Sequence, residues 1–128
     1  MQKIVVDTSF LINAMIVSEH KHMACVDFLK KNEAELIAPE MLLIESASYF
    51  VRILHHNKEE VYTHLEKIQN FIKIEGNYTK IENVIDLICK YKTRGADSLY
   101  LRLADKHNCS LLTCDKDQAQ KFSKSIYI

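Results

Sequence analysis

Short apolar runs alternate with longer segments of helical periodicity along the whole chain. Five runs rich in Ile, Val and Leu are typical of buried strands, and they span residues 3–6, 35–38, 71–74, 110–113 and 125–128. Between these runs, apolar residues recur every three or four positions. This spacing predicts helices over residues 9–15, 22–31, 39 to about 55, 58–69, 79 to about 88, 96–107 and 115–122.

Two local signals refine these boundaries. Pro39 suits the first turn of the third predicted helix, because proline's missing N–H costs nothing there. The stretch from Thr79 to Glu82 has the Thr-x-x-Glu spacing of a capping box, which predicts the start of the fifth helix.

Strands that alternate with helices predict an α/β fold, with a parallel sheet covered by helices on both faces. The 128 residues, 48% of them hydrophobic, provide a core for one domain over residues 1–128 and too little for two. In sheets of this kind, ligands bind beyond the carboxyl ends of the strands, where the strand order reverses. We therefore expect any functional site to lie at these strand ends.

Composition narrows the functional classes. No apolar run is long enough to cross a membrane, and Asp7 comes too early for a signal peptide, so we expect a cytoplasmic protein with no membrane partner. The formal net charge is zero, which does not mark a nucleic-acid-binding protein. The lysines near Arg94 and Asp115, among them Lys116, either hold a polyanion or are ordinary solvated side chains.

Four acidic residues lie at positions where a carboxylate could take part in catalysis. Asp7 and Asp115 follow the predicted strands 3–6 and 110–113, Asp97 lies at the start of a helix, and Glu45 lies within an apolar helix. Each also has a structural explanation. Asp7 and Asp115 are favoured helix caps, and Asp97 suits the positive end of a helix dipole.

Glu45 has its own structural alternative, a half-exposed ion pair with Arg52 on the same helix face.

Taken together, the four acids indicate metal chemistry. Carboxylates gathered at one end of a sheet repel each other unless a cation enters. Mg²⁺ and Mn²⁺ prefer oxygen ligands, and one or two such ions activate water for attack on a phosphodiester. A zinc site at His20, His22 and Cys25 is a weaker alternative, because no fourth ligand is apparent. No serine or cysteine nucleophile with a suitably spaced histidine is evident.

The same residues resemble the PIN-domain ribonucleases, and among them the VapC-type toxins of toxin–antitoxin pairs. The motifs that carry the resemblance are Val5 to Ile12, Ala38 to Glu45, Arg94 to Leu99 with Leu103-Ala104, and Leu112 to Asp117. The resemblance covers essentially the whole chain. It implies a Rossmann-like PIN domain with five parallel strands, an endoribonuclease that depends on Mg²⁺ or Mn²⁺, a homodimer, and a cognate antitoxin that covers the site.

The resemblance also assigns roles by position. Asp7, Glu45, Asp97 and Asp115 match the acidic, metal-binding site of the family. Further matches are Ser9 and Thr113 as supporting hydroxyls, Asp117 as a fifth acid, and Arg94 as a phosphate contact; Lys116 is added as an RNA-binding residue from its place beside Asp115.

Two alternatives from other functional classes remain. A phosphorylation-receiver domain also gathers acids at strand ends, but it needs a paired acid on the first strand and a lysine late in the chain. Here Asp7 stands alone, and Asp115 follows the strand that ends at Thr113. The second alternative is a non-catalytic PIN-like domain that only binds partners. Separately, Tyr49, Phe50, Ile53 and Tyr62 are a candidate apolar surface for a partner subunit, and packing in the core is an equally good interpretation of Phe50 and Ile53.

Overall fold

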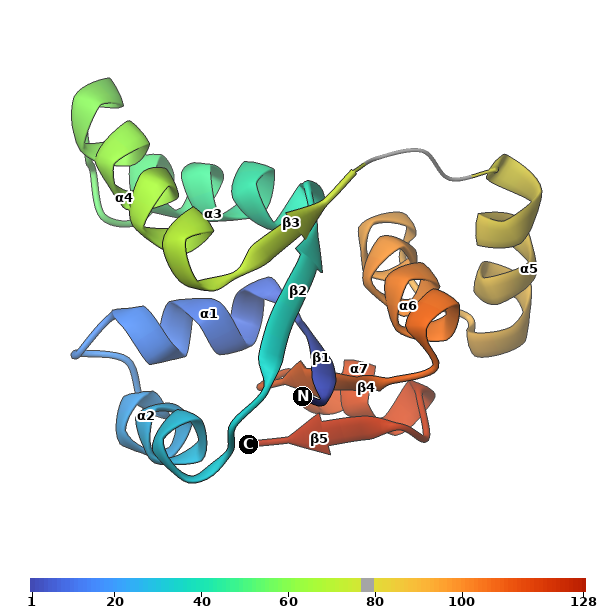
Figure 1. Ribbon diagram of the computed structural model, residues 1–128. Coiled ribbons are helices and arrows are strands. Elements are labelled where there is room, and N and C mark those ends of the chain that lie inside the picture. Colours follow the sequence, from blue (N-terminus) through green and yellow to red (C-terminus); the bar gives the residue numbers. More distant parts are fainter. Residues whose placement is uncertain (77–79) are drawn as a thin grey trace.

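The computed structural model describes residues 1–76 and 80–128, and its centre is a five-stranded parallel sheet (Figure 1). The strand order is β3-β2-β1-β4-β5. All four neighbouring pairs are parallel. The strands are β1 (Lys3–Val6), β2 (Glu35–Pro39), β3 (Lys73–Glu75), β4 (Ser110–Thr113) and β5 (Ser125–Tyr127).

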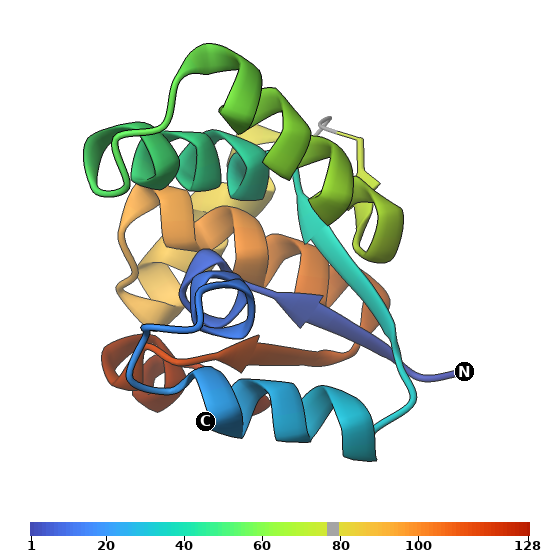
Figure 2. The ribbon, with the colours of Figure 1, turned by 90° about the vertical axis from the view of Figure 1, so that its left-hand side faces the viewer.

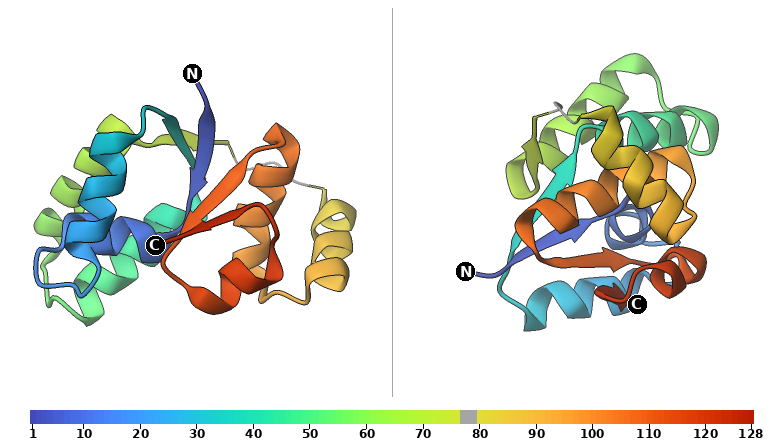
Figure 3. Two further views of the ribbon diagram at one scale, coloured as in Figure 1. Left: turned by 90° about the horizontal axis from the view of Figure 1, so that it is seen from below. Right: turned by 90° about the vertical axis from the view of Figure 1, so that its right-hand side faces the viewer.

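Helices cover both faces of this sheet, as the alternating pattern predicts. Their bounds are α1 (Thr8–Met15), α2 (His22–Lys31), α3 (Met41–Arg52), α4 (Lys58–Phe71), α5 (Ile81–Tyr91), α6 (Gly95–His107) and α7 (Lys116–Lys121). Helices α1 to α4 lie on one side of the sheet and α5 to α7 on the other, as the left panel of Figure 3 shows. The predicted α/β class with a five-stranded parallel sheet is therefore confirmed.

Two predicted boundaries are wrong for physical reasons. Pro39 is the last residue of β2, not the first turn of a helix, and α3 begins two residues later at Met41. The third strand begins at Lys73, because Phe71 extends α4 and Ile72 is its C-cap, packed into the core at 1% exposure.

The expected capping box includes Thr79, which lies outside the described residues. Helix α5 has Lys80 as its N-cap, without a side-chain capping bond.

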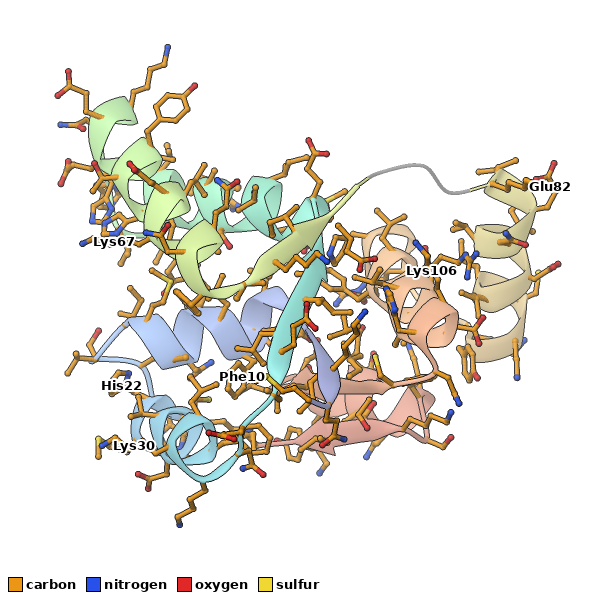
Figure 4. All side chains as sticks on the ribbon, in the orientation of Figure 1. Phe10, His22, Lys30, Lys67, Glu82 and Lys106 are labelled. Atoms are coloured by element: carbon orange, nitrogen blue, oxygen red, sulfur yellow. The ribbon has the colours of Figure 1, made fainter. Side chains whose placement is uncertain are left out.

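The core lies where the helices meet the sheet. The central strands contribute Val5, Ile37 and Leu111, all fully buried, and α1 adds Phe10 at 1% exposure. Figure 4 shows Phe10 inside the molecule, whereas Lys30, Lys67 and Glu82 project from its surface. No helix in the described part of the chain is long and apolar enough to cross a bilayer.

The strand order reverses between β1 and β4. From β1 the chain moves outward to β2 and β3, and then returns across the sheet to add β4 and β5 on the other side of β1. In Figure 2, β1 runs away from the N-terminus towards the start of α1. A receiver domain has the order 2-1-3-4-5, so this topology excludes the receiver alternative. In sheets of this kind, the reversal is where a ligand site is expected, beyond the carboxyl ends of β1 and β4.

The buried face of β2 yields a stability prediction. Ile37→Ala removes a fully buried side chain from the sheet and is expected to lower the free energy of unfolding by about 2–5 kcal/mol. Ile81→Ala, the same change at 64% exposure on α5, is expected to cost less than about 0.5 kcal/mol. Urea unfolding followed by circular dichroism measures both values. Equal losses in the two variants would contradict the placement of Ile37 in the core.

Candidate functional site

Asp7 occupies the carboxyl end of β1 and caps α1. Its carboxylate accepts hydrogen bonds from the Phe10 amide at 3.1 Å and the Ser9 hydroxyl at 2.7 Å, both on Oδ1. The Thr113 hydroxyl donates to the second oxygen, Oδ2. Asp7 is only 6% exposed. The capping interpretation is therefore correct, but a cap alone does not require burial or two side-chain donors from different elements.

Ser9 and Thr113 also connect the two central strand ends. The Ser9 hydroxyl accepts from the Cys114 amide at 2.9 Å, and the Thr113 hydroxyl accepts from the Asp115 amide at 2.9 Å. The two hydroxyl oxygens lie 3.2 Å apart. Because these bonds join the β1–α1 turn to the β4–α7 turn, Asp7 and Asp115 are held on adjacent strands.

Asp115 caps α7 with one carboxylate oxygen. Its Oδ1 accepts from the amides of Asp117 at 2.9 Å and Gln118 at 3.3 Å. Its Oδ2 faces Arg94, whose Nη2 lies 3.7 Å away. The carboxylate is about one-third exposed, with one oxygen bound to the helix amides and the other facing Arg94.

Arg94 and Gln118 bring Asp97 close to Asp115. Arg94 precedes α6 and donates from Nε to Asp97 Oδ2 at 3.1 Å. Gln118, 3% exposed, turns its amide to the same carboxylate; with its nitrogen towards Asp97, it donates at 3.1 and 3.2 Å. One guanidinium thus bridges two of the four acids.

Glu45 is positioned by hydroxyl groups. Its Oε1 accepts from Tyr100 at 2.5 Å and from Thr8 at 3.0 Å. Within the described residues it makes no ion pair with Arg52, which lies exposed in the last turn of α3, so that alternative is not supported. Helices α1, α3 and α6 therefore meet at this carboxylate.

Asp117 and Lys116 lie at the edge of this group. Asp117 is exposed and pairs with Lys121 one turn later, at 3.0 Å. Lys116 is the exposed first residue of α7. The structure thus links Asp7, Asp97 and Asp115 through Ser9, Thr113 and Arg94 and places Glu45 near Asp97, while Asp117 pairs with Lys121 along α7.

The carboxylates influence each other electrostatically. Burial raises the pKa of Asp7 to about 6, against the lowering effect of its three hydrogen bonds, and Asp115 adds repulsion. Burial also raises the pKa of Asp97, where Arg94 opposes the shift and Asp115 and Glu45 add to it. Raised carboxyl pKa values are typical of functional sites.

The donor atoms suit a hard cation. Carboxylate and hydroxyl oxygens are the ligands that Mg²⁺ and Mn²⁺ prefer. In residues 1–76 and 80–128, no three acidic, histidine or cysteine side chains converge closely enough to enclose an ion. The charge is instead offset by Arg94 between Asp97 and Asp115. The set fits Mg²⁺ or Mn²⁺ by donor type.

The zinc alternative finds no support. His22 Nδ1 lies 2.9 Å from the Asn13 carbonyl oxygen, and the Cys25 thiol lies 3.4 Å from that of Cys114.

Three contributors are absent from the sequence predictions: Thr8, Tyr100 and Gln118. Tyr100 follows Asp97 by three residues, and residues three apart share a helix face, so this spacing was a usable signal. Thr8 and Gln118 give no such signal, because Thr and Gln next to caps are ordinary surface residues.

The buried Asp7 predicts a specific pH dependence. Its folded-state pKa of about 6 lies above its ordinary value of 3.8, so ionisation destabilises the fold as the pH rises from about 4 to 6. At about 1.4 kcal/mol per pH unit, the shift corresponds to about 3 kcal/mol. Asp7→Asn should therefore become more stable relative to the wild type by up to this amount between pH 4 and pH 7. Urea unfolding in excess chelator measures the difference, with Asp105→Asn, an exposed acid on α6, as control. A difference that stays flat with pH would contradict the prediction.

Comparisons with known proteins agree with this fold. The family model described as the PIN domain matches residues 4–122. The fold is similar to that of the Mycobacterium tuberculosis toxin VapC20, with a TM-score of 0.76 and 14% identity over 91% of this chain and 93% of that one. A chain from a Klebsiella pneumoniae toxin–antitoxin complex has a TM-score of 0.72 and 17% identity, over 95% of this chain and 94% of that one. FitAcB from Neisseria gonorrhoeae has a TM-score of 0.71 and 12% identity, over 98% of this chain and 96% of that one.

At these identities the structural likeness shows the fold alone. No curated protein sequence matches the chain significantly. The family match, however, spans nearly all of the sequence and every residue of the acidic site. The chain therefore belongs to the PIN-domain family.

Proposed function

We propose that the protein is a metal-dependent endoribonuclease, of the VapC toxin type, that hydrolyses RNA phosphodiester bonds. The observation that carries the proposal is the buried Asp7 carboxylate, held by Ser9 and Thr113 at the strand-order reversal beside Asp115. The PIN family match supports it. So does the likeness in fold to VapC20, which is described as a sarcin–ricin loop cleaving toxin.

Asp7, Asp97 and Asp115 are the proposed ligands of Mg²⁺ or Mn²⁺, and Glu45 is a ligand or orients the attacking water. Bound Mg²⁺ or Mn²⁺ supplies Lewis acidity and lowers the pKa of water. The raised pKa values of Asp7 and Asp97 favour this assignment, because burial and, to a lesser extent, repulsion disfavour their ionised forms and a bound cation offsets both effects. Asp117, paired with Lys121, is a peripheral candidate ligand.

The protein's own groups orient these carboxylates. Ser9 and Thr113 fix both oxygens of Asp7, and the α7 amides fix one oxygen of Asp115, which leaves the other facing Arg94. Water attack on phosphorus with expulsion of the 3′ oxygen leaves a 5′-phosphate and a 3′-hydroxyl. A cyclic 2′,3′-phosphate among the products would indicate a different reaction.

Arg94 and Lys116 are the proposed RNA contacts. Arg94 is 74% exposed and reaches both Asp97 and Asp115, so its guanidinium lies on the solvent side of these acids. Once a cation neutralises those acids, the guanidinium is free to bind a phosphate. Lys116 lies exposed at the start of α7, next to Asp115.

A cognate antitoxin and a homodimer are the proposed partners. The antitoxin proposal rests on the likeness in fold to a chain from a toxin–antitoxin complex. Of the expected partner surface, Ile53 and Tyr62 are exposed by 54% and 63%, which leaves them available for contact. Phe50 is fully buried, so of its two interpretations the one that places it in the core is correct, and its ring packs against His64.

Loss of a metal ligand tests the proposal. Asp97→Asn is expected to lower the rate of RNA cleavage on the order of a hundredfold or more, because it removes a charge from the metal site. Asp105→Asn is a matched control, since it makes the same change on the same helix at an exposed acid paired with Arg102. Cleavage of a fluorescent RNA with Mn²⁺ and with excess chelator is the measurement. Full activity in chelator, or in Asp97→Asn, would contradict the proposal.

The two basic residues are expected to respond differently. Arg94→Gln removes a cation that competes for Asp97 and Asp115, so Mn²⁺ affinity should rise about two- to tenfold while RNA affinity falls. Lys116→Gln removes an equal charge, but Lys116 makes no ion pair with the acids in the described structure. This variant should therefore lower the affinity for RNA and leave the affinity for Mn²⁺ unchanged. Calorimetry with Mn²⁺ and RNA binding in Ca²⁺ measure the two affinities. Weaker Mn²⁺ binding by Arg94→Gln would overturn this assignment.

A further inference from the structure

Three side chains from three helices form one hydrogen-bonded group. Tyr100 of α6 donates its hydroxyl to Glu45 Oε1 at 2.5 Å, and Thr8 of α1 donates to the same oxygen at 3.0 Å. The two hydroxyl oxygens lie 2.7 Å apart. Glu45 itself comes from α3. One carboxylate oxygen is therefore held by two donors that other parts of the fold fix in place.

Tyr100 is among the largest fully buried side chains, at 1% exposure. A buried phenol requires a hydrogen-bond partner, and a carboxylate is a stronger partner than a neutral acceptor. A phenol hydroxyl carries its proton near neutral pH, and here its oxygen lies 2.5 Å from Glu45 Oε1, so Tyr100 is the donor of this bond.

The bonds divide the two oxygens of Glu45 into different roles. Oε1 accepts from both hydroxyls, whereas Oε2 accepts no hydrogen bond within the described residues. Helix α6, which carries Tyr100, also carries Asp97, three residues earlier and therefore on the same face of the helix. Asp97 is close enough to Glu45 for their charges to interact. Helix α6 thus brings one acid to the site and aligns a second.

We propose that Tyr100 is a positioning residue that, together with Thr8, holds Glu45 by Oε1 so that Oε2 faces the metal and the attacking water. This inference rests on the proposed function, because it assigns the orientation of one of its acids. A purely structural role for the same bond makes a different prediction: its loss would lower stability and leave metal binding and turnover unchanged.

Tyr100→Phe tests the role, since it keeps the ring and removes only the hydroxyl. We expect kcat for RNA cleavage and the affinity for Mn²⁺ each to fall about 10- to 100-fold, as for other groups that orient metal ligands. The KM for RNA should stay within about threefold of the wild type, because RNA contacts are unaffected. Unchanged kcat and unchanged Mn²⁺ affinity would overturn the proposal.

The control is Tyr127→Phe. The Tyr127 hydroxyl accepts a side-chain hydrogen bond from Lys21 at 2.8 Å, and neither residue belongs to the acidic set. This variant loses one tyrosine hydroxyl outside the site and is expected to leave kcat and Mn²⁺ affinity unchanged. If Tyr127→Phe lowers kcat as much as Tyr100→Phe does, the effect is general and the proposal fails.

A double-mutant cycle isolates the contact. In a Glu45→Gln background, Tyr100→Phe should add little further loss of kcat, because the group that it positions has already been changed. Additive losses would overturn the proposal. Thr8→Val serves as a second variant if Tyr100→Phe unfolds, and it should lower kcat and Mn²⁺ affinity while Thr8→Ser restores both.

Failure of this inference is distinguishable from failure of the proposed function. If the wild-type protein cleaves RNA only with added metal and Tyr100→Phe is equally active, the result contradicts the positioning role of Tyr100 and supports the proposed function. If the wild-type protein cleaves RNA in excess chelator, the result contradicts the proposed metal-dependent function. In that case Mn²⁺ calorimetry still decides the positioning role, since weaker binding by Tyr100→Phe supports it and equal binding overturns it.

Discussion

The Asp7 carboxylate lies buried between the ends of β1 and β4, where a backbone amide and two hydroxyls donate to it. Burial of a carboxylate is costly unless it is hydrogen-bonded, and here the donors come from both strand ends. The same hydroxyls accept bonds from the amides of the β4–α7 turn. The site is therefore part of the sheet's construction, and its geometry depends on the pairing of β1 with β4.

The other acids are stabilised by different means, and this arrangement keeps four like charges near one another. Arg94 neutralises Asp97 and Asp115 from the solvent side, while neutral hydroxyls orient Glu45 from the core side. Burial raises the pKa values of Asp7 and Asp97, and repulsion from the neighbouring acids adds to both shifts. A fold that concentrates charge in this way gives up stability at its site, which is the usual relation between stability and function.

The sequence allowed the fold to be predicted, because strand and helix periodicities alternate without long loops and Asp7 and Asp115 follow strands that prove adjacent. The boundaries at Pro39 and Phe71 could not be predicted, because helix and strand signals overlap there and tertiary packing decides between them. Glu45 needed the family resemblance, since its helix face also offered Arg52 as a partner. Its true partners, Thr8 and Tyr100, are 37 and 55 residues away in sequence, beyond the range of local pattern.

The location of bound Mn²⁺ tests the central claim most directly, that the four acids form one metal site at the strand-order reversal. Anomalous scattering from crystals grown with Mn²⁺ locates the ion without reference to activity. The predicted result is a peak within coordinating distance of Asp7 and Asp115, with Arg94 turned away from the acids. A fully occupied peak elsewhere, or Mn²⁺ absent from this site at saturating concentration, would contradict the claim.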